Sequence, residues 1–306
     1  MNPNFVGGEG MEFILNFMDK IGICDEAKKY LAETANMILK NDEAKKLLFS
    51  CETDYFGDGD GDYTDKTLDM VSVLTGVHIY TVHFVFLLCM AERLKHDYMN
   101  AGLEENLYWD LMRDLKYKLD ECYAVHKIWG TFVFSWFRDH YRMKRFALGR
   151  FQYEEKVYDG EPYQKGDIVL NPGDVVYNFH IPSSGSIKKE IRLDSYKKAF
   201  RFFAKEGQKY IIFMCFSYLL YPENKTTFPK DSNLYSFMED FDIISVRKDD
   251  SFHDAWRIFN TDDVSDLSRL PQDTTLQKNY IERLKNGGTF GLGTGIIIFD
   301  GEKIIR

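Results

Sequence analysis

The chain contains the stretch Val175-Val-Tyr-Asn-Phe-His180-Ile-Pro-Ser-Ser-Gly-Ser186, which predicts an extended strand followed by a tight turn. Residues 189–206 then place apolar side chains at the three- and four-residue intervals of one helix face: Leu193, Tyr196, Ala199, Phe200 and Phe203. Residues 210–218 are apolar again and too short for a typical helix, so they predict a second strand. We therefore expect a strand, a turn, a helix and a strand in succession.

The turn in this unit is the strongest candidate site in the sequence. Backbone N–H groups at a helix N-terminus have no partner within the helix, and together they favour an anion. Lysines in the first helical turn oppose the helix dipole, so their presence favours a negative charge nearby. A solvated turn with ordinary surface lysines is the alternative interpretation. The predicted anion-binding residues are Ser183, Ser184, Gly185, Ser186, Lys188 and Lys189.

The two halves of the chain differ in sequence pattern. Residues 1–143 predict helices almost throughout, including a buried helix within 68–97 that breaks near Gly76 and a longer one over 104–127. From Arg145 onward, alternating and Pro/Gly-punctuated segments predict strands at 145–154, 241–246, 256–259 and 295–299, with helices at 232–238 and 274–285. We expect an α+β protein, with a helical domain over 1–143 and an α/β domain over 144–306.

Composition excludes several classes of function. The formal net charge of −9 argues against binding to nucleic acid or to an anionic membrane. The five cysteines are scattered and never form a Cys-x-x-Cys pair, which favours a reducing compartment and gives no zinc site. The acidic stretch 58–62 matches only part of a calcium-binding loop, so we interpret it as a surface loop and expect no metal.

The sequence also bears on location. The N-terminal residues 1–8 have neither a basic segment nor a long apolar one, so we expect no signal peptide. Polar residues interrupt the apolar run from Val71 to Met90, which favours a buried helix over a membrane anchor. We therefore expect a cytoplasmic protein. The oligomeric state does not follow from the sequence.

Several motifs of the C-terminal half resemble those of a known family of bacterial two-domain acyltransferase-like proteins. They are Leu148-Gly-Arg-Phe-Gln-Tyr-Glu154, His180-Ile-Pro-Ser-Ser-Gly, Asp194-Ser195 with Ala199 and Phe202-Phe203, Cys215-x-Ser217-x-Leu219, Ser232-Asn233 and Leu270-Pro-x-Asp-Thr-x-Leu-Gln277. That family pairs a helical N-terminal region with a C-terminal domain similar to the GNAT superfamily of N-acyltransferases. The N-terminal half agrees in helical character more than in motifs. The resemblance implies a mixed, mainly antiparallel central sheet.

The resemblance also implies a co-substrate, acyl-CoA or acetyl-CoA. In GNAT enzymes a strand leads into a pyrophosphate-binding loop and helix, and the next strand diverges to admit the acyl-CoA arm. The unit at 175–217 would occupy that place. The superfamily's loop carries the pattern Gln/Arg-x-x-Gly-x-Gly/Ala, however, and Pro182-Ser-Ser-Gly-Ser186 does not match it.

Four residues are candidates for the chemistry of acyl transfer. His180 is a potential general base because imidazole titrates near neutrality, and Glu154 is a second potential base. Cys215 and Ser217 lie two residues apart on one strand face, where either would protonate a departing thiolate or Cys215 would carry an acyl group. Three of them also have a structural alternative. His180 would bond to a loop carbonyl, Glu154 would be a carboxylate at the rim of the domain, and Cys215 would be a buried apolar thiol.

Asn233 and Tyr235 are candidates for orienting the substrate, although Ser232-Asn233 also suits a helix cap. Two functions remain open. One is an N-acyltransferase that moves an acyl group from acyl-CoA to an amine of a small molecule or peptide. The other is a non-catalytic ligand-binding or regulatory protein with the same fold, in which the missing glycine pattern reflects lost catalysis.

Overall fold

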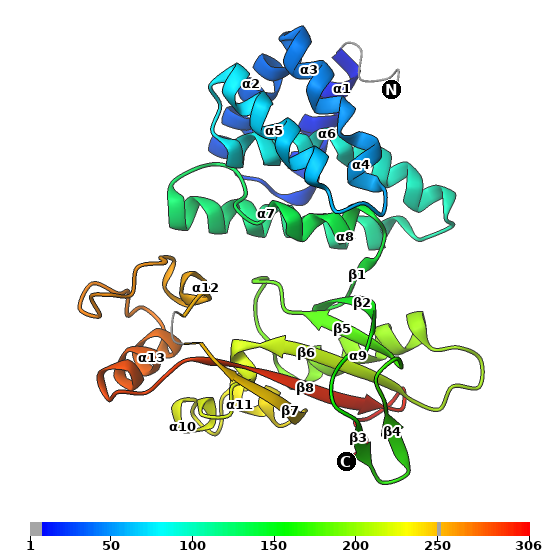
Figure 1. Cartoon of the computed structure of the whole chain (residues 1–306), viewed down its shortest axis with the longest axis vertical. Helices are drawn as coiled ribbons and strands as arrows, with labels where there is room; N and C mark the ends of the chain where they lie inside the picture. The colour runs from blue at the N-terminus through cyan, green and yellow to red at the C-terminus, as the bar shows by residue number, and fades with distance from the viewer. Residues whose placement is uncertain (1–7, 250–251) are drawn as a thin grey trace. The chain divides into compact units, whose positions relative to one another are not determined.

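The computed structural model describes residues 8–249 and 252–306. The chain divides into two compact units, one ending at Phe146 and the other spanning Ala147–Arg306 (Figure 1). Residues 1–7, which hold most of the segment behind the expectation of no signal peptide, lie outside the described residues.

The first unit is built from helices packed around an apolar core. They are α1 (Gly8–Ile21), α2 (Asp25–Lys40), α3 (Asp42–Ser50), α4 (Glu52–Phe56), α5 (Asp62–Thr75), α6 (Ile79–Asn100), α7 (Glu105–His126), η2 (Phe134–Phe137) and α8 (Arg138–Tyr141). The predicted break near Gly76 is confirmed, because this glycine ends α5 in the left-handed region at φ +68°. The helical character of the N-terminal half is therefore as expected.

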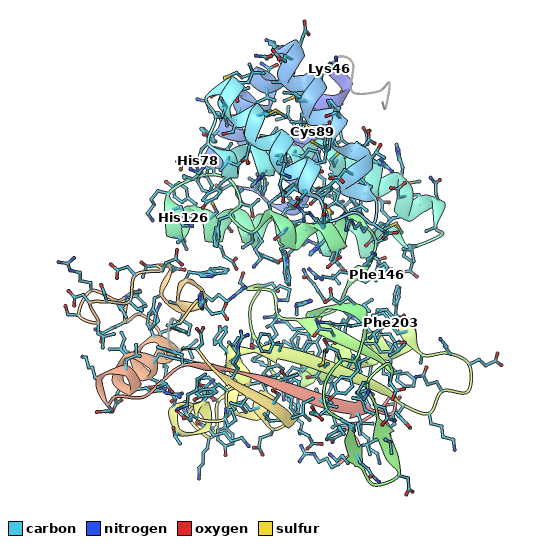
Figure 2. The ribbon with its side chains drawn as sticks, in the orientation of Figure 1. Lys46, His78, Cys89, His126, Phe146 and Phe203 are labelled. Carbon is cyan, nitrogen blue, oxygen red and sulfur yellow. The ribbon has the colours of Figure 1, made fainter. Side chains whose placement is uncertain are left out.

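The apolar run at 71–90 supplies much of the core of this unit. Twelve residues of α6 are buried, among them Cys89, which Figure 2 labels inside the bundle. In the described ranges no single helix has the length and apolar character to cross a membrane, although α5 and α6 together, bent by 114°, have both.

The second unit is built on a six-stranded sheet in the order β1-β2-β5-β6-β8-β7. The strands are β1 (Arg145–Leu148), β2 (Phe151–Val157), β5 (Val175–His180), β6 (Ile211–Ser217), β7 (Asp242–Lys248) and β8 (Gly291–Phe299). Strands β5 and β6 pair parallel, whereas the β2–β5, β6–β8 and β7–β8 pairs are antiparallel. The expected fold class, a helical region followed by an α/β domain with a mixed, mainly antiparallel sheet, is confirmed.

The remaining elements surround this sheet. Strands β3 (Tyr163–Lys165) and β4 (Ile168–Leu170) form a separate hairpin, visible in Figure 1. Helix α9 (Lys189–Phe203) follows the turn after β5, as predicted. Shorter helical segments follow β6 and β7: η3 (Tyr218–Leu220), α10 (Asn224–Thr227), α11 (Asn233–Met238), α12 (Ala255–Phe259) and α13 (Thr275–Lys285).

Two predicted elements were wrong in detail. The single strand expected at 145–154 is split into β1 and β2 by Gly149, whose φ is +79° and whose missing side chain lets the turn lie against Ser195 of α9. The strand expected at 256–259 is the short helix α12. A short buried apolar run fits either structure by its pattern alone, and here Trp256, Ile258 and Phe259 are buried from a helix.

Helix α9 and one face of the sheet share an aromatic core. Tyr196 of α9 packs near Phe151 and Phe213, with ring centroids 5.8 and 5.5 Å away. Tyr153 and Phe179, which are paired across β2 and β5, belong to the same core. Because side chains alternate along a strand, the neighbouring residues Gln152, Glu154, Asn178 and His180 project from the opposite face.

Candidate functional site

Strands β5 and β6 pair over only part of their length. The two strands pair only at Tyr177 with Phe213 and at Asn178 with Met214. Beyond these pairs, Phe179 and His180 pair with β2, whereas Cys215 to Ser217 pair with β8. Within the described residues the two strands are thus separate where β5 reaches His180. His180 therefore lies beyond the last pair between β5 and β6.

His180 lies in a cluster of polar side chains on one face of the sheet. Its Nε2 is 2.9 Å from Oε1 of Glu154, and the same oxygen accepts a hydrogen bond of 2.8 Å from Nδ2 of Asn178. The register explains the cluster, because Gln152 faces His180 and Glu154 faces Asn178 across β2 and β5. His180 and Glu154 keep 23% and 16% of their side-chain surface exposed, so the pair is accessible to a ligand.

Two groups lie next to Nε2 of the His180 ring. One is Oε1 of Glu154, which only accepts hydrogen bonds when it is ionised, and the other is Nδ2 of Asn178, a donor 3.1 Å away. A neighbouring carboxylate suits a histidine that accepts a proton, because it orients the ring and stabilises the charged form.

Gln152 lies on the same face of the sheet, paired with His180. Its side chain is only 2% exposed, and its Oε1 accepts no hydrogen bond from any described residue. A buried polar atom without a partner is costly, and native proteins retain few of them. Gln152 therefore places an enclosed polar group next to His180.

The turn after β5 is held by Arg150. Its guanidinium donates to the backbone carbonyls of Pro182, Gly185 and Ser186 and to Oγ of Ser184, over distances of 2.8–3.1 Å. Residues 183–186 are exposed, as are Lys188 and Lys189 at the start of α9. The predicted anion-binding residues thus lie together on the surface, around the N-terminus of a fifteen-residue helix.

A buried ion pair anchors the same helix N-terminus. Arg192 is fully buried, and its Nε donates to Oδ2 of Asp240 over 2.7 Å. Its other nitrogens donate to the carbonyls of Ile187 and Ser236. Ser195 adds a second anchor by donating to the Leu148 carbonyl over 2.6 Å. These contacts join the turn, α9, α11 and the β1–β2 connection.

Cys215 and Ser217 are not brought together with His180. Asn178 pairs with Met214, so the side chains of the odd-numbered residues of β6 project from the face opposite His180. Cys215 is 1% exposed, and burial raises the pKa of its thiol well above the usual range. Oγ of Ser217 accepts the Leu219 N–H at the start of η3. In the structure Cys215 is thus a buried thiol and Ser217 is the N-cap of η3.

Asn233 and Tyr235 lie on α11, which Arg192 links to the start of α9 through Ser236. Ser232 is the cap of this helix, since its Oγ accepts the Tyr235 N–H over 3.1 Å. The structure therefore puts the two predicted substrate residues on an element next to the turn. It gives neither a contact with His180.

Four residues of this region escaped the sequence analysis as site residues: Arg150, Gln152, Asn178 and Arg192. Gln152 and Asn178 had a detectable signal, because they alternate with Glu154 and His180 and so share their strand faces. Arg192 had none, because a charged residue on a helix is usually solvated. Arg150 stood within a motif already noted, but its reach to residues 182–186 depends on the tertiary fold.

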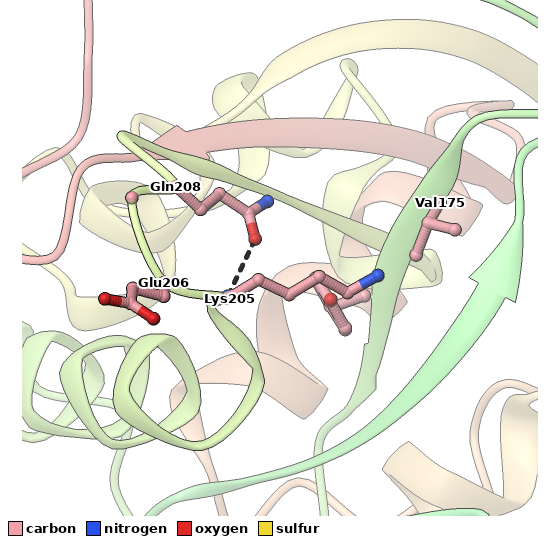
Figure 3. Close-up of a pocket in the computed structure, with 6 residues that line it drawn as sticks. Val175, Lys205, Glu206 and Gln208 are labelled. Carbon is pink, nitrogen blue, oxygen red and sulfur yellow. Dashed lines mark hydrogen bonds between the residues drawn. The ribbon is translucent and has the colours of Figure 1, made fainter.

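One hollow lies elsewhere in the second unit. It measures about 380 Å³ and is lined by Val175, Tyr177 and the loop 205–208 after α9 (Figure 3). It sits at the start of β5, opposite the end that carries His180, and includes none of the predicted site residues. Over the described part of the chain, no group of three or more His, Cys, Asp or Glu side chains is arranged to hold a metal ion.

Comparison with known proteins extends over nearly the whole chain. Residues 12–143 match the family model described as an N-acyltransferase N-terminal domain, and residues 146–297 match the GNAT-like C-terminal domain. No curated protein is detectably similar in sequence.

Solved structures share the fold. An acyltransferase in complex with decanoyl-CoA and teicoplanin is 16% identical with a TM-score of 0.73, over 94% of this chain and 88% of that one. An acyltransferase in complex with decanoyl-CoA is 19% identical with a TM-score of 0.70, over 93% of this chain and 86% of that one.

Proposed function

Because the chain belongs to the family in which an N-acyltransferase N-terminal domain precedes a GNAT-like C-terminal domain, we propose that it moves an acyl group from acyl-CoA to an amine. The observation that carries this proposal is the divergence of β5 and β6 beside His180. We propose that an extended thioester arm lies between the two strands where their pairing stops. The exposed turn at the same end of β5 provides donors for its phosphates.

In the proposed reaction the amine nitrogen attacks the thioester carbonyl carbon. A carbon–nitrogen bond forms, the carbon–sulfur bond breaks, and CoA leaves as its thiolate. His180 accepts the amine proton, while Glu154, 2.9 Å from Nε2, stabilises the charged ring. Because Cys215 is buried on the other face, we propose direct transfer without an acyl-cysteine intermediate.

The acceptor amine is proposed to bind beside His180, which keeps 23% of its side-chain surface exposed. Gln152 pairs with His180 across β2 and β5 and lies beneath this position. Asn233 and Tyr235 remain proposed contacts for the rest of the acceptor, from the neighbouring helix α11. We propose a small molecule or peptide as this acceptor.

The acyl donor is the part of the proposal that can be tested first. Acyltransferases of the same fold have been solved with decanoyl-CoA and with CoA and a teicoplanin derivative, so medium-chain acyl-CoAs and a glycopeptide amine are the first probes to use.

The described cysteines are all free thiols, which suits a reducing compartment, and we propose that the reaction is cytoplasmic.

Thermal unfolding with acetyl-, octanoyl- and decanoyl-CoA tests the proposal. A ligand that binds the native state raises the melting temperature, by an amount that grows with its concentration. We expect a rise with at least one acyl-CoA, and CoA release with an amine panel in a free-thiol assay. Binding without release would favour the ligand-binding alternative. No rise across the series would contradict both acyl transfer and acyl-CoA binding.

A further inference from the structure

Phe216 of β6 lies on the face of the sheet that carries His180. Asn178 pairs with Met214, and His180 and Phe216 each follow that pair by two residues on their own strands. Because side chains alternate along a strand, all four project from the same face. Phe216 is 49% exposed, whereas Met214 is 7% exposed. The sheet therefore presents an exposed aromatic ring on the same face as the proposed base.

The β3–β4 hairpin explains why exposure changes along this face. Its residues Tyr163 and Ile168 pack against a buried apolar cluster that includes Ile212, Met214 and Ile296. Phe216, two residues further along β6 than Met214, is exposed instead. One part of the face is therefore protein core, whereas the ring of Phe216 remains accessible to a ligand.

Arg247 of β7 adds a positive charge to the accessible part. Phe216 pairs with Thr294, and Thr294 pairs with Ser245, so Arg247, two residues beyond Ser245, projects from the same face. Its guanidinium carbon lies 5.4 Å from the centre of the Phe216 ring. The Arg247 side chain is exposed, and it forms no hydrogen bond or ion pair with any described residue.

Asp242, at the other end of β7, provides a contrast on the same face. It pairs with Ile296, and its Oδ2 lies 2.6 Å from Nζ of Lys165 and accepts a hydrogen bond from Tyr163. The charge of Asp242 is thus compensated within the protein, whereas that of Arg247 is available to an anion. A guanidinium held against an aromatic ring keeps N–H donors at its edge, in the fork that matches a carboxylate.

We propose that Phe216 and Arg247 form the part of the acceptor site that binds a carboxylate distant from the reacting amine. The assignment rests on the proposed function, because it takes His180 as the base that receives the amine proton. It names the acceptor class as a short peptide with a free amine at one end and a free carboxylate at the other.

The dimensions of the sheet set the length of this acceptor. Neighbouring strands lie about 5 Å apart, and Arg247 extends a further 5.4 Å from the Phe216 ring, so the amine and the carboxylate are on the order of 10 Å apart. An extended chain spans about 3.5 Å per residue, so this separation corresponds to roughly three residues. We therefore expect a tripeptide to reach both groups.

Acylation of the peptides Gly-Gly-Leu and Gly-Gly-Leu-amide tests the assignment, because only the first has a charged C-terminus. CoA release from octanoyl-CoA gives kcat/KM for each peptide. We expect the unsubstituted protein to prefer the acid about fivefold, through KM rather than kcat. Arg247→Gln should reduce this preference to about one. Phe216→Ala should lower it as well, because Arg247 loses the ring against which it lies.

Each substitution has a matched control. Arg201→Gln should keep the preference, because Arg201 is also an exposed arginine without a side-chain partner in the described chain, but it lies on α9. Val246→Ala should keep it too, since Val246 is 50% exposed on the opposite face of β7. Melting temperatures establish that all four variants are folded.

Equal kcat/KM for the two peptides in the unsubstituted protein would overturn the assignment, as would a preference that survives in Arg247→Gln. CoA release with other amines but with neither peptide would also overturn it. Absence of CoA release with every amine tested would instead reject the proposed function.

Discussion

The two units of this protein each contain a histidine next to a carboxylate, in opposite environments. In the helical unit Nε2 of His140 lies 3.3 Å from Oδ2 of Asp114, and both side chains are buried, at 0% and 1% exposure. In the sheet unit His180 and Glu154 approach to 2.9 Å and remain partly exposed. The same pair of residue types is thus enclosed in one unit and accessible in the other.

The two pairs also differ in what surrounds them. Trp136 also donates to Oδ2 of Asp114 over 2.9 Å, so the buried carboxylate joins elements of the helical core. Such a pair contributes mainly to stability, because removing one partner leaves a buried group without compensation. The pair at His180 lies where two strands separate, which gives a ligand access to it.

The largest expected effect is on activity, at His180. His180→Gln removes the proposed base, and we expect kcat to fall about 10²- to 10⁴-fold with little change in acyl-CoA affinity. CoA release and thermal shift measure the two quantities. His253→Gln is the control, because His253 also lies next to a carboxylate, with its Nδ1 3.0 Å from Oδ1 of Asp249, but its side chain is 81% exposed. Unchanged turnover in His180→Gln would remove this residue from the mechanism.

The second largest expected effect is a loss of stability on substitution of Asp114. Asp114→Ala removes the buried carboxylate that His140 and Trp136 contact, and we expect the free energy of unfolding to fall by about 3–5 kcal/mol. Urea denaturation measures this change, with His253→Ala as an exposed control that should stay within about 0.5 kcal/mol. If Asp114→Ala lowered the free energy of unfolding as little as His253→Ala does, the buried pair of Asp114 and His140 would contribute no more to stability than the exposed pair of His253 and Asp249.

Glu154 should have a smaller effect than His180, because it acts through the histidine. Glu154→Gln keeps the size of the side chain and removes its charge, and we expect kcat to fall about tenfold with KM for acyl-CoA unchanged. Glu155→Gln is the matched control, since the adjacent side chain is exposed on the other strand face. Equal effects in the two variants would argue against an orienting role for Glu154.

The smallest predicted effect is the pH dependence of stability. Burial by itself raises the pKa of Asp114, but the His140 ring, the Lys118 charge and the Trp136 N–H outweigh burial and hold the pKa well below its usual range. The unfolded chain then binds more protons in acid, so the contribution of Asp114 is present above about pH 4 and is lost as the pH falls.

Urea titrations at pH 5 and pH 3 test this sign. The difference in unfolding free energy between the unsubstituted protein and Asp114→Asn should shrink by about 1 kcal/mol over this interval. A difference that stays constant would show that Asp114 has the same proton affinity in the folded and unfolded states.

Most of the fold could be predicted from the sequence, because the signals involved are local. Apolar periodicity located α9 and the helices of the first half, and Gly76 marked the break between α5 and α6. The segment at 256–259 was missed, because a short apolar run does not distinguish a strand from a buried helix. The motifs of the C-terminal half also resembled the family to which the chain belongs.

The sequence by itself determined the two-part organisation, the strand–turn–helix–strand unit and the candidates His180 and Glu154. Only the tertiary structure placed these two side chains together, turned Cys215 to the opposite face and brought Arg150 to the turn. The physical reason is the separation along the sequence over which each signal acts. Periodicity and turn chemistry act over a few residues, whereas strand register and arginine contacts join residues more than twenty positions apart.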